Sequence, residues 1–291
     1  MKIQLDFIKF YFEICDVSMD SNQNPSDILE SLFVIPREVP KTILRNLLEL
    51  IYDVKVAGSE NIPESGGALI ISNHTDYLDI PVQGAFADRK IVYLGKYELF
   101  HPQEEIMAIL NHKNSPFQYP PLSLTKPVIE VLLNSLGSVV KKNLINWGSM
   151  PIIRNAAKDS EMDKRAAMDY YEKLETYMVD LMKEGELLSI YPEGSRSETG
   201  ELQSFRAMAA KLAIRAGVPI IPSGIVGATN MSKPKAFLTG DAFKTKIRYQ
   251  IGKPILPSEF PTGPEKKAAK ELTEILENRV RELMKQAQSI L

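Results

Sequence analysis

The chain has 291 residues, of which 44% are hydrophobic and 25% are charged, a size and composition that favour a globular protein with one large core. Its 35 basic and 37 acidic residues leave a formal net charge of −2, so no basic excess argues for a nucleic-acid partner. The single cysteine excludes an internal disulfide, and no apolar run reaches 18 residues, which argues against a membrane-spanning helix. Asp6 and Lys9 interrupt the N-terminus where a signal peptide needs an apolar run, so a cytoplasmic protein is expected.

Residues 1–52 are predicted to form an N-terminal helical unit. Residues 2–17 carry charges at alternating spacings of three and four, with aromatic and aliphatic side chains between them, which is typical of an amphipathic helix. Ser26 or Asp27 could cap a short second helix, and Pro40 is predicted to begin a third. The aromatic face of the first helix could pack on the rest of the protein, or it could contact a membrane surface or an acyl chain.

Residues 53–291 are predicted to form an α/β domain, because short β-rich runs alternate with helical stretches. The predicted strands span residues 54–57, 68–72, 91–94, 187–191, 220–226 and 246–251. The predicted helices span residues 161–184, 205–216 and 264–288. The expected fold is a mixed, mostly parallel sheet flanked by helices, together with the N-terminal helical unit. Residues 100–147 mix proline turns with an apolar stretch and give no clear prediction.

The stretch ALIISNHTDYLDIP, residues 68–81, places ionisable side chains directly after an apolar strand. His74 lies at the predicted C-terminal end of that strand, and ligands bind at this edge of open α/β sheets. A helix beginning near Thr75 could turn the carboxylate of Asp79 back toward the imidazole. The carboxylate would fix the tautomer and leave the other ring nitrogen as a general base. The alternative is that the segment merely caps a helix and His74 is a polar loop residue.

The stretch YPEGSRS, residues 191–197, also follows an apolar run. Gly194 lets the backbone approach a ligand, and Ser195 and Arg196 supply hydroxyl and guanidinium donors. Arginine binds phosphate through two parallel charge-assisted hydrogen bonds. Glu193 could orient Arg196 or touch a substrate hydroxyl. The alternative is a polar turn with an internal pair between glutamate and arginine.

Two further stretches give weaker signals. GSMPIIRN, residues 148–155, ends in Arg154, which could be a second phosphate ligand or a solvated surface residue. VPIIP, residues 218–222, is an apolar strand bracketed by prolines. His101 and His112 lack the cysteine or acidic spacing of zinc ligands, so no metal site is predicted. The sequence also contains neither a G-x-S-x-G elbow nor a glycine-rich phosphate loop.

In this order, the four motifs resemble those of the glycerophospholipid acyltransferase family, whose best-known members make phosphatidic acid from lysophosphatidic acid. The matching positions are Asn73, His74 and Asp79 for N-H-x4-D; Gly148, Ile152 and Arg154 for G-x-x-x-I-x-R; Pro192, Glu193, Gly194, Arg196 and Ser197 for F-P-E-G-T-R-S; and Val218, Pro219 and Pro222 for the fourth block. The resemblance covers roughly residues 54–256. Tyr191 and Ser195 stand where phenylalanine and threonine are usual, and the segment between GKYELF and Arg154 is longer than expected.

The resemblance implies that His74, oriented by Asp79, takes the proton from an acceptor hydroxyl that attacks an acyl thioester. Backbone N–H groups near the start of the helix after His74 are plausible oxyanion donors. The implied substrate-binding residues are Lys96, Arg154, Glu193, Gly194, Ser195 and Arg196. The three cations among them would hold the acceptor phosphate, which is catalysis largely by positioning.

The expected function is transfer of a fatty acyl group to lysophosphatidate in phospholipid biosynthesis. Glycerol 3-phosphate is the alternative acceptor, because the large N-terminal unit resembles that of soluble glycerol-3-phosphate acyltransferases. Outside this class, the same residues could form an anionic-lipid-binding module or an acyl-thioester hydrolase. No cofactor is expected, the co-substrate being a thioester of CoA or acyl carrier protein. The expected partner is a membrane surface, to which the protein would attach peripherally on the inner face. Residues 128–140 could line a groove for the acyl chain or insert into that surface.

Overall fold

The computed structural model describes residues 34–113, 115–153 and 164–290. The chain divides into two compact units, one containing residues 103–142 and the other containing residues 35–102 and the chain from residue 143 onward. The predicted helix over residues 2–17 and the predicted cap at Ser26 or Asp27 lie outside the described residues.

The larger unit is built on a seven-stranded sheet in the order β1-β7-β6-β2-β5-β3-β4. The strands are β1 (Asp53–Ala57), β2 (Ala68–Ser72), β3 (Ile91–Lys96), β4 (Ser149–Ile152), β5 (Leu187–Ile190), β6 (Ile220–Val226) and β7 (Lys246–Ile251). Every neighbouring pair is parallel except β6 with β7. The predicted α/β fold with a mixed, mostly parallel sheet is therefore confirmed. Strand β4 was not among the predicted strands, and its Pro151 is tolerated because β4 lies at the sheet edge.

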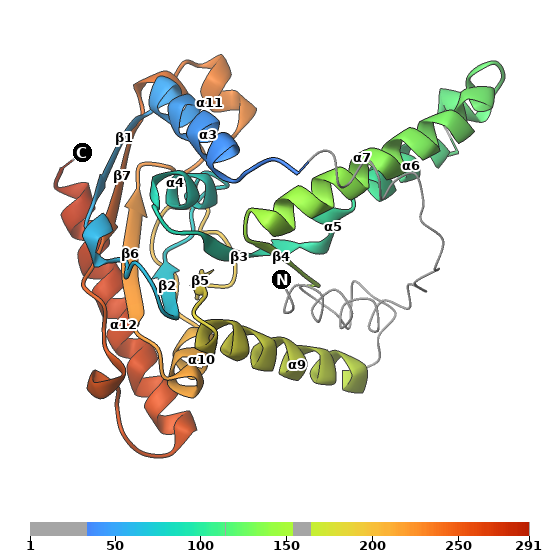
Figure 1. The fold of residues 1–291 in the computed structure, drawn as a ribbon. Helices are drawn as coiled ribbons and strands as arrows, with labels where there is room; N and C mark the ends of the chain where they lie inside the picture. Colours follow the sequence, from blue (N-terminus) through green and yellow to red (C-terminus); the bar gives the residue numbers. More distant parts are fainter. Residues whose placement is uncertain (1–33, 114, 154–163, 291) are drawn as a thin grey trace. The chain divides into compact units, whose positions relative to one another are not determined.

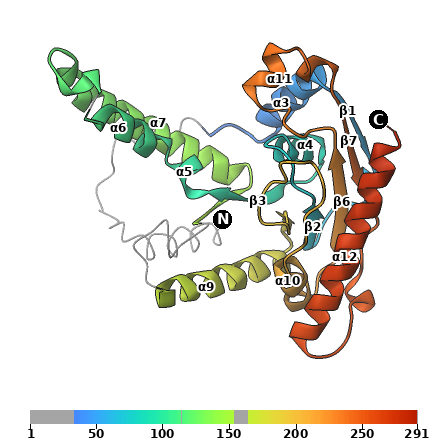
Figure 2. The ribbon, with the colours of Figure 1, turned by 180° about the vertical axis from the view of Figure 1, so that it is seen from behind.

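Helices cover both faces of this sheet. They are α3 (Glu38–Ile51), α4 (Asp79–Phe86), α5 (Tyr97–Phe100), α9 (Lys164–Lys183), α10 (Met208–Ala216), α11 (Pro234–Leu238) and α12 (Glu265–Gln288). Helix α12 runs along β6 and β7 on one face, while α3 and α4 lie over the other face (Figures 1 and 2). The helices predicted near the C-terminus and before Gly217 are present, the latter beginning three residues late, at Met208.

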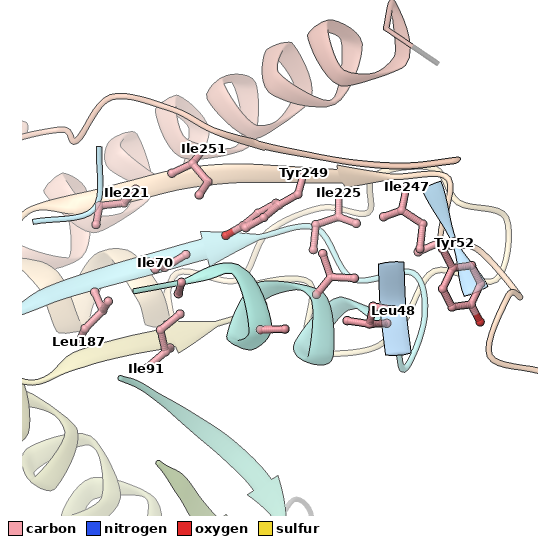
Figure 3. Close-up of a cluster of buried hydrophobic side chains, with 14 of the residues drawn as sticks. Leu48, Tyr52, Ile70, Ile91, Leu187, Ile221, Ile225, Ile247, Tyr249 and Ile251 are labelled. Carbon is pink, nitrogen blue, oxygen red and sulfur yellow. The ribbon is translucent and has the colours of Figure 1, made fainter. Parts of the chain in front are cut away.

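The core beneath α3 and α4 is formed by alternate residues of the strands (Figure 3). Ile221 and Ile225 of β6 point into it together with Tyr249 of β7, as the two-residue period of a strand requires. Leu48 and Tyr52 close the same core and are both 3% exposed, and burying one such side chain contributes about 1.5–3 kcal/mol. Helix α3 thus belongs to the sheet unit, so the predicted boundary after residue 52 does not coincide with the edge of this unit.

Strand β2 lies near the centre of the sheet and is buried along its whole length, which explains its uninterrupted apolar sequence. Ile71 pairs with Ile190 of β5 on one side and with Pro222 of β6 on the other. Because these strands are parallel, their C-terminal ends meet at one edge of the sheet. This edge brings the segment after residue 72 beside the segment after residue 190.

The smaller unit contains α6 (Pro102–Asn111) and the N-terminal part of α7 (Lys126–Asn146). The side of α7 at Gly137 faces α6, because a Cβ there would meet the side-chain amide of Gln103. Lys126 Nζ donates to Asn111 Oδ1 over 3.1 Å across the connection. Among the described helices, none is both long and apolar enough to cross a bilayer.

Candidate active site

The imidazole of His74 is held by a buried carboxylate. Its Nδ1 lies 2.8 Å from Oδ2 of Asp79, and Asp79 is completely buried while the His74 side chain is 17% exposed. An ionised carboxylate can only accept, so Nδ1 carries the hydrogen and Nε2 presents its lone pair. The arrangement supplies a general base with a fixed tautomer, just after the C-terminal end of the central strand β2.

The turn between His74 and Asp79 differs from the predicted one. Helix α4 begins at Asp79, not near Thr75, because the Asp79 carboxylate draws the chain before it into a turn. Oδ2 accepts from the N–H groups of Thr75 at 2.6 Å and Asp76 at 2.8 Å. These two N–H groups are therefore engaged within the protein, and the expectation of oxyanion donors near the start of the helix after His74 stays a prediction.

Asn73 fixes the end of β2 to β6. Its side-chain amide donates to the carbonyl of Ile225 over 2.8 Å and accepts from the N–H of the same residue over 2.8 Å. Asn73 is completely buried and does not cap α4. It holds the strand immediately before His74 in register with its neighbour.

Replacing Asn73 by alanine is expected to destabilise the fold severely. Both main-chain groups of Ile225 would lose their partner in a buried place, at a cost of about 1–3 kcal/mol each. Urea unfolding measures the loss, and Asn61→Ala is the matched control. Asn61 donates one hydrogen bond, to the Ile251 carbonyl, from a half-buried position, so its replacement should cost about 1 kcal/mol. Equal losses in the two variants would contradict the bridging role.

The stretch YPEGSRS, residues 191–197, forms a clamp that binds both the N–H and the carbonyl of His74. Glu193 Oε1 accepts from the His74 N–H over 2.7 Å, and the Ser197 N–H donates to the His74 carbonyl over 2.7 Å. Glu193 Oε2 accepts from the N–H of Gln203 over 3.0 Å. Glu193 is thus a positioning residue whose two oxygens both bind main chain. Its predicted contact with Arg196 or a substrate hydroxyl stays a prediction.

Replacing Glu193 by glutamine is expected to change how stability depends on pH. Burial raises the pKa of Glu193 above its ordinary value of 4.5, although the two backbone N–H groups partly oppose this. The folded protein therefore holds this proton more tightly than the unfolded chain. The stability from this group is present below the unfolded pKa and is lost as pH rises through the raised folded pKa.

In urea unfolding, the stability advantage of the wild type over Glu193→Gln should shrink as pH rises from about 4 to about 7. The glutamine also places its NH₂ group against one backbone N–H, which costs one hydrogen bond, or about 1 kcal/mol. An advantage that grows with pH would mean that the two N–H groups lower the pKa of Glu193 by more than burial raises it.

The ring of Tyr191 packs against one face of the His74 imidazole. The rings of His74 and Tyr191 stack with centroids 4.3 Å apart and planes inclined by 24°. The Tyr191 hydroxyl is buried without a hydrogen-bond partner among the residues that the structure describes, and burial raises its pKa well above the ordinary range. The ring therefore contributes packing, while the hydroxyl carries a desolvation cost.

We expect Tyr191→Phe to keep activity and to raise the free energy of unfolding by about 1 kcal/mol, because it removes an unpaired buried hydroxyl. Tyr191→Leu removes the stacked ring and should lower kcat severalfold. Rate assays and urea unfolding on both variants distinguish these effects. Loss of activity in the phenylalanine variant would instead assign the hydroxyl a role in the reaction.

The structure describes two of the three predicted phosphate ligands, Lys96 and Arg196. The Arg196 guanidinium lies 3.5 Å from the centroid of the Tyr77 ring, and both side chains are exposed. Lys96 is exposed at the C-terminal end of β3. Ser195 Oγ lies 3.5 Å from Gln203 Oε1. Arg154 lies outside the described residues.

The backbone conformation at Gly194 favours glycine, and a further cation, Arg206, lies beside it. Its φ of 77° lies in the left-handed region, and a Cβ there would approach the Arg206 guanidinium to 2.8 Å. Sequence reasoning missed Arg206, together with the roles of Tyr77 and Tyr191. Arg206 stands in the stretch FRAM, and only its exposed charge shortly after the motif could have signalled it. The site therefore combines a general base with exposed guanidinium groups from the adjacent loops.

Comparisons with known proteins give the family of this chain. The family model described as Acyltransferase matches residues 53–226, which is more than half of the chain and includes both motifs. The chain therefore belongs to the Acyltransferase family, as its motifs predicted.

Individual relatives are more distant. The chain is 24% identical over 241 residues to the 1-acyl-sn-glycerol-3-phosphate acyltransferase of Bacillus subtilis, covering 82% of this chain and 92% of that protein. It is 26% identical over 177 residues to the chloroplastic 1-acyl-sn-glycerol-3-phosphate acyltransferase LPAT1 of Arabidopsis thaliana, covering 60% of this chain but only 36% of that protein. The crystal structure of the 1-acyl-sn-glycerophosphate (LPA) acyltransferase PlsC from Thermotoga maritima aligns with a TM-score of 0.49 and 21% identity, covering 85% of this chain and 80% of that one.

Proposed function

We propose that the protein transfers a fatty acyl group from a thioester to the free hydroxyl of lysophosphatidate, forming phosphatidate. The observation that carries this proposal is the Nδ1 contact of His74 with the buried Asp79 carboxylate, which leaves Nε2 as a base. The relative from Bacillus subtilis, whose name states this acceptor, supports the choice of substrate.

In this reaction the acceptor hydroxyl gives its proton to Nε2 of His74 while its oxygen attacks the thioester carbonyl carbon. A C–O bond forms, and the tetrahedral intermediate then releases the thiolate as the C–S bond breaks. The imidazolium returns the proton to the thiolate, which leaves as a thiol. The negative charge of Asp79 stabilises the imidazolium between these two transfers. No covalent acyl-enzyme is needed.

The acceptor phosphate would be held by cations around the same edge. Arg196 over the Tyr77 ring and Arg206 beside Gly194 are exposed, and we assign Lys96 and Arg154 to the same role from the family resemblance. Gly194 and Ser195 would line the path of the acceptor. Holding the phosphate places the hydroxyl beside Nε2 and thereby lowers the entropic barrier of the reaction.

The donor in this proposal is acyl-CoA or acyl-acyl carrier protein, used as a co-substrate without a further cofactor. We propose that the protein works peripherally at the inner, cytoplasmic face of a membrane, because its lipid acceptor and product reside there. Glycerol 3-phosphate is the competing acceptor, since it carries the same phosphate beside a free hydroxyl.

The test measures thiol release from long-chain acyl-CoA without an acceptor, with glycerol 3-phosphate and with lysophosphatidate. Release that requires lysophosphatidate supports the proposal, while release only with glycerol 3-phosphate would replace the acceptor. Release without any acceptor would indicate a hydrolase. If acyl-CoA and acyl-acyl carrier protein both fail, the site would be a lipid-binding module.

A further inference from the structure

An exposed tyrosine stands in the turn between His74 and α4. Tyr77 is 67% exposed, although the residues on both sides of it are held in place. Asp76 donates its N–H to Oδ2 of Asp79 over 2.8 Å, and its own Oδ1 accepts from the N–H of Leu78 over 3.0 Å. The main chain around Tyr77 is therefore fixed, while most of the residue is open to solvent.

The ring of Tyr77 is covered on one face by Arg196. The guanidinium carbon lies 3.5 Å from the ring centroid, which is van der Waals contact. A guanidinium nitrogen turned toward the ring would come closer than contact, so the two flat groups lie face to face. The next residue, Ser197, donates its N–H to the carbonyl of His74 over 2.7 Å, which anchors Arg196 beside the segment that carries the base.

The N–H groups of Arg196 are available to a ligand. Within the part of the chain that the structure describes, its guanidinium forms no salt bridge and no hydrogen bond, and the residue is exposed. The donors of a guanidinium lie in its plane, so a ring against one face leaves them accessible at the edge. A phosphate binds at that edge through two parallel hydrogen bonds.

We propose that Tyr77 is a positioning residue that holds the Arg196 guanidinium in place for the acceptor phosphate. This inference rests on the proposed function, in which Arg196 binds that phosphate. An exposed arginine has many side-chain conformations, and a phosphate that binds it must restrict them at a cost in free energy. Stacking on a ring whose main chain is fixed restricts them before the acceptor arrives. Tyr77 thereby affects the affinity for the acceptor and not the proton transfer at His74.

The experiment compares variants with the wild type in steady-state acyl transfer to a short-chain, water-soluble lysophosphatidate. Tyr77→Leu removes the ring, while Tyr77→Phe keeps the ring and removes only the hydroxyl. The matched control is Tyr119→Leu, which removes a tyrosine of the smaller unit that is 66% exposed. Arg196→Gln is measured alone and together with Tyr77→Leu, which shows whether the two side chains act through each other.

We expect Tyr77→Leu to raise KM for the acceptor about three- to tenfold with kcat nearly unchanged, the effect of one long side chain that is no longer ordered in advance. Tyr77→Phe should keep the wild-type KM, because phenylalanine also attracts a cation to its face, and so should Tyr119→Leu. In the Arg196→Gln protein, adding Tyr77→Leu should have no further effect. An unchanged KM in Tyr77→Leu, or an equal rise with and without Arg196, would overturn the proposal.

Calorimetric binding of the same lysophosphatidate without a donor separates this inference from the proposed function. The affinity should fall about three- to tenfold in Tyr77→Leu, because this measurement does not depend on turnover. Wild-type turnover with equal affinity in Tyr77→Leu would overturn the positioning role alone. Weaker binding by Tyr77→Leu without any wild-type turnover would overturn the enzymatic function and leave the positioning role standing. A wild type that neither binds nor turns over this lipid would overturn both.

Discussion

Replacing His74 by alanine is expected to lower kcat for acyl transfer by about 10²–10⁴-fold, the contribution of a positioned general base. The reason is that the variant lacks the Nε2 that accepts the proton of the acceptor hydroxyl, while the carboxylate of Asp79 keeps its bonds to Thr75 and Asp76. The fold should survive, because the clamp from Glu193 binds the main chain of residue 74 and not its ring. Initial rates of thiol release at saturating substrates measure the effect.

The matched control is His112→Ala, which removes an exposed imidazole from the smaller unit. It should leave the rate on a water-soluble acceptor unchanged. A His74→Ala protein that unfolds like the wild type in urea and keeps its turnover would show that another residue is the base.

Replacing Asp79 by asparagine is expected to lower kcat by about 10²–10⁴-fold with little change in KM. Asparagine has the shape of aspartate but no charge, so it cannot stabilise the imidazolium that forms during proton transfer. If its NH₂ group turns toward His74, it also selects the wrong tautomer. The same steady-state assay measures both parameters.

Asp76→Asn provides the control for this change. Asp76 is also buried, and its Oδ1 accepts from the N–H of Leu78 over 3.0 Å. The described hydrogen bonds of Asp76 go to Asp79 and Leu78 and not to the ring of His74, so the rate should fall far less than in Asp79→Asn. The opposite ranking of the two variants would assign the orienting role to Asp76.

Much of the sheet could be predicted from the sequence because buried parallel strands are short, apolar and rich in β-branched residues. Strand β2 is the clearest case. Strand β4 escaped prediction because Pro151 argues against a strand, and only its edge position makes proline acceptable. Helix α7 was not predicted, because aliphatic residues on its exposed side obscure the usual amphipathic pattern.

The site was predictable in its residue types but not in all of its contacts. The spacing between His74 and Asp79 predicted their hydrogen bond, which is present. The partner of Glu193 could not be predicted, because sequence neighbourhood favours Arg196 whereas the folded chain brings the backbone of residue 74 to the carboxylate. Backbone groups leave no signature in a sequence, so this clamp required the structure.

The long reach of that clamp affects when activity can begin during synthesis. Glu193 holds a residue 119 positions earlier, and Asn73 pairs with a residue 152 positions later. At about 5–20 residues per second, a ribosome adds the missing partners roughly 6–30 s after His74. In that interval the nascent chain holds both His74 and Asp79 but lacks the neighbouring strands that fix them. We therefore expect acyl transfer to start only after β6 has been made, so that an unfinished chain would not consume thioester on the ribosome.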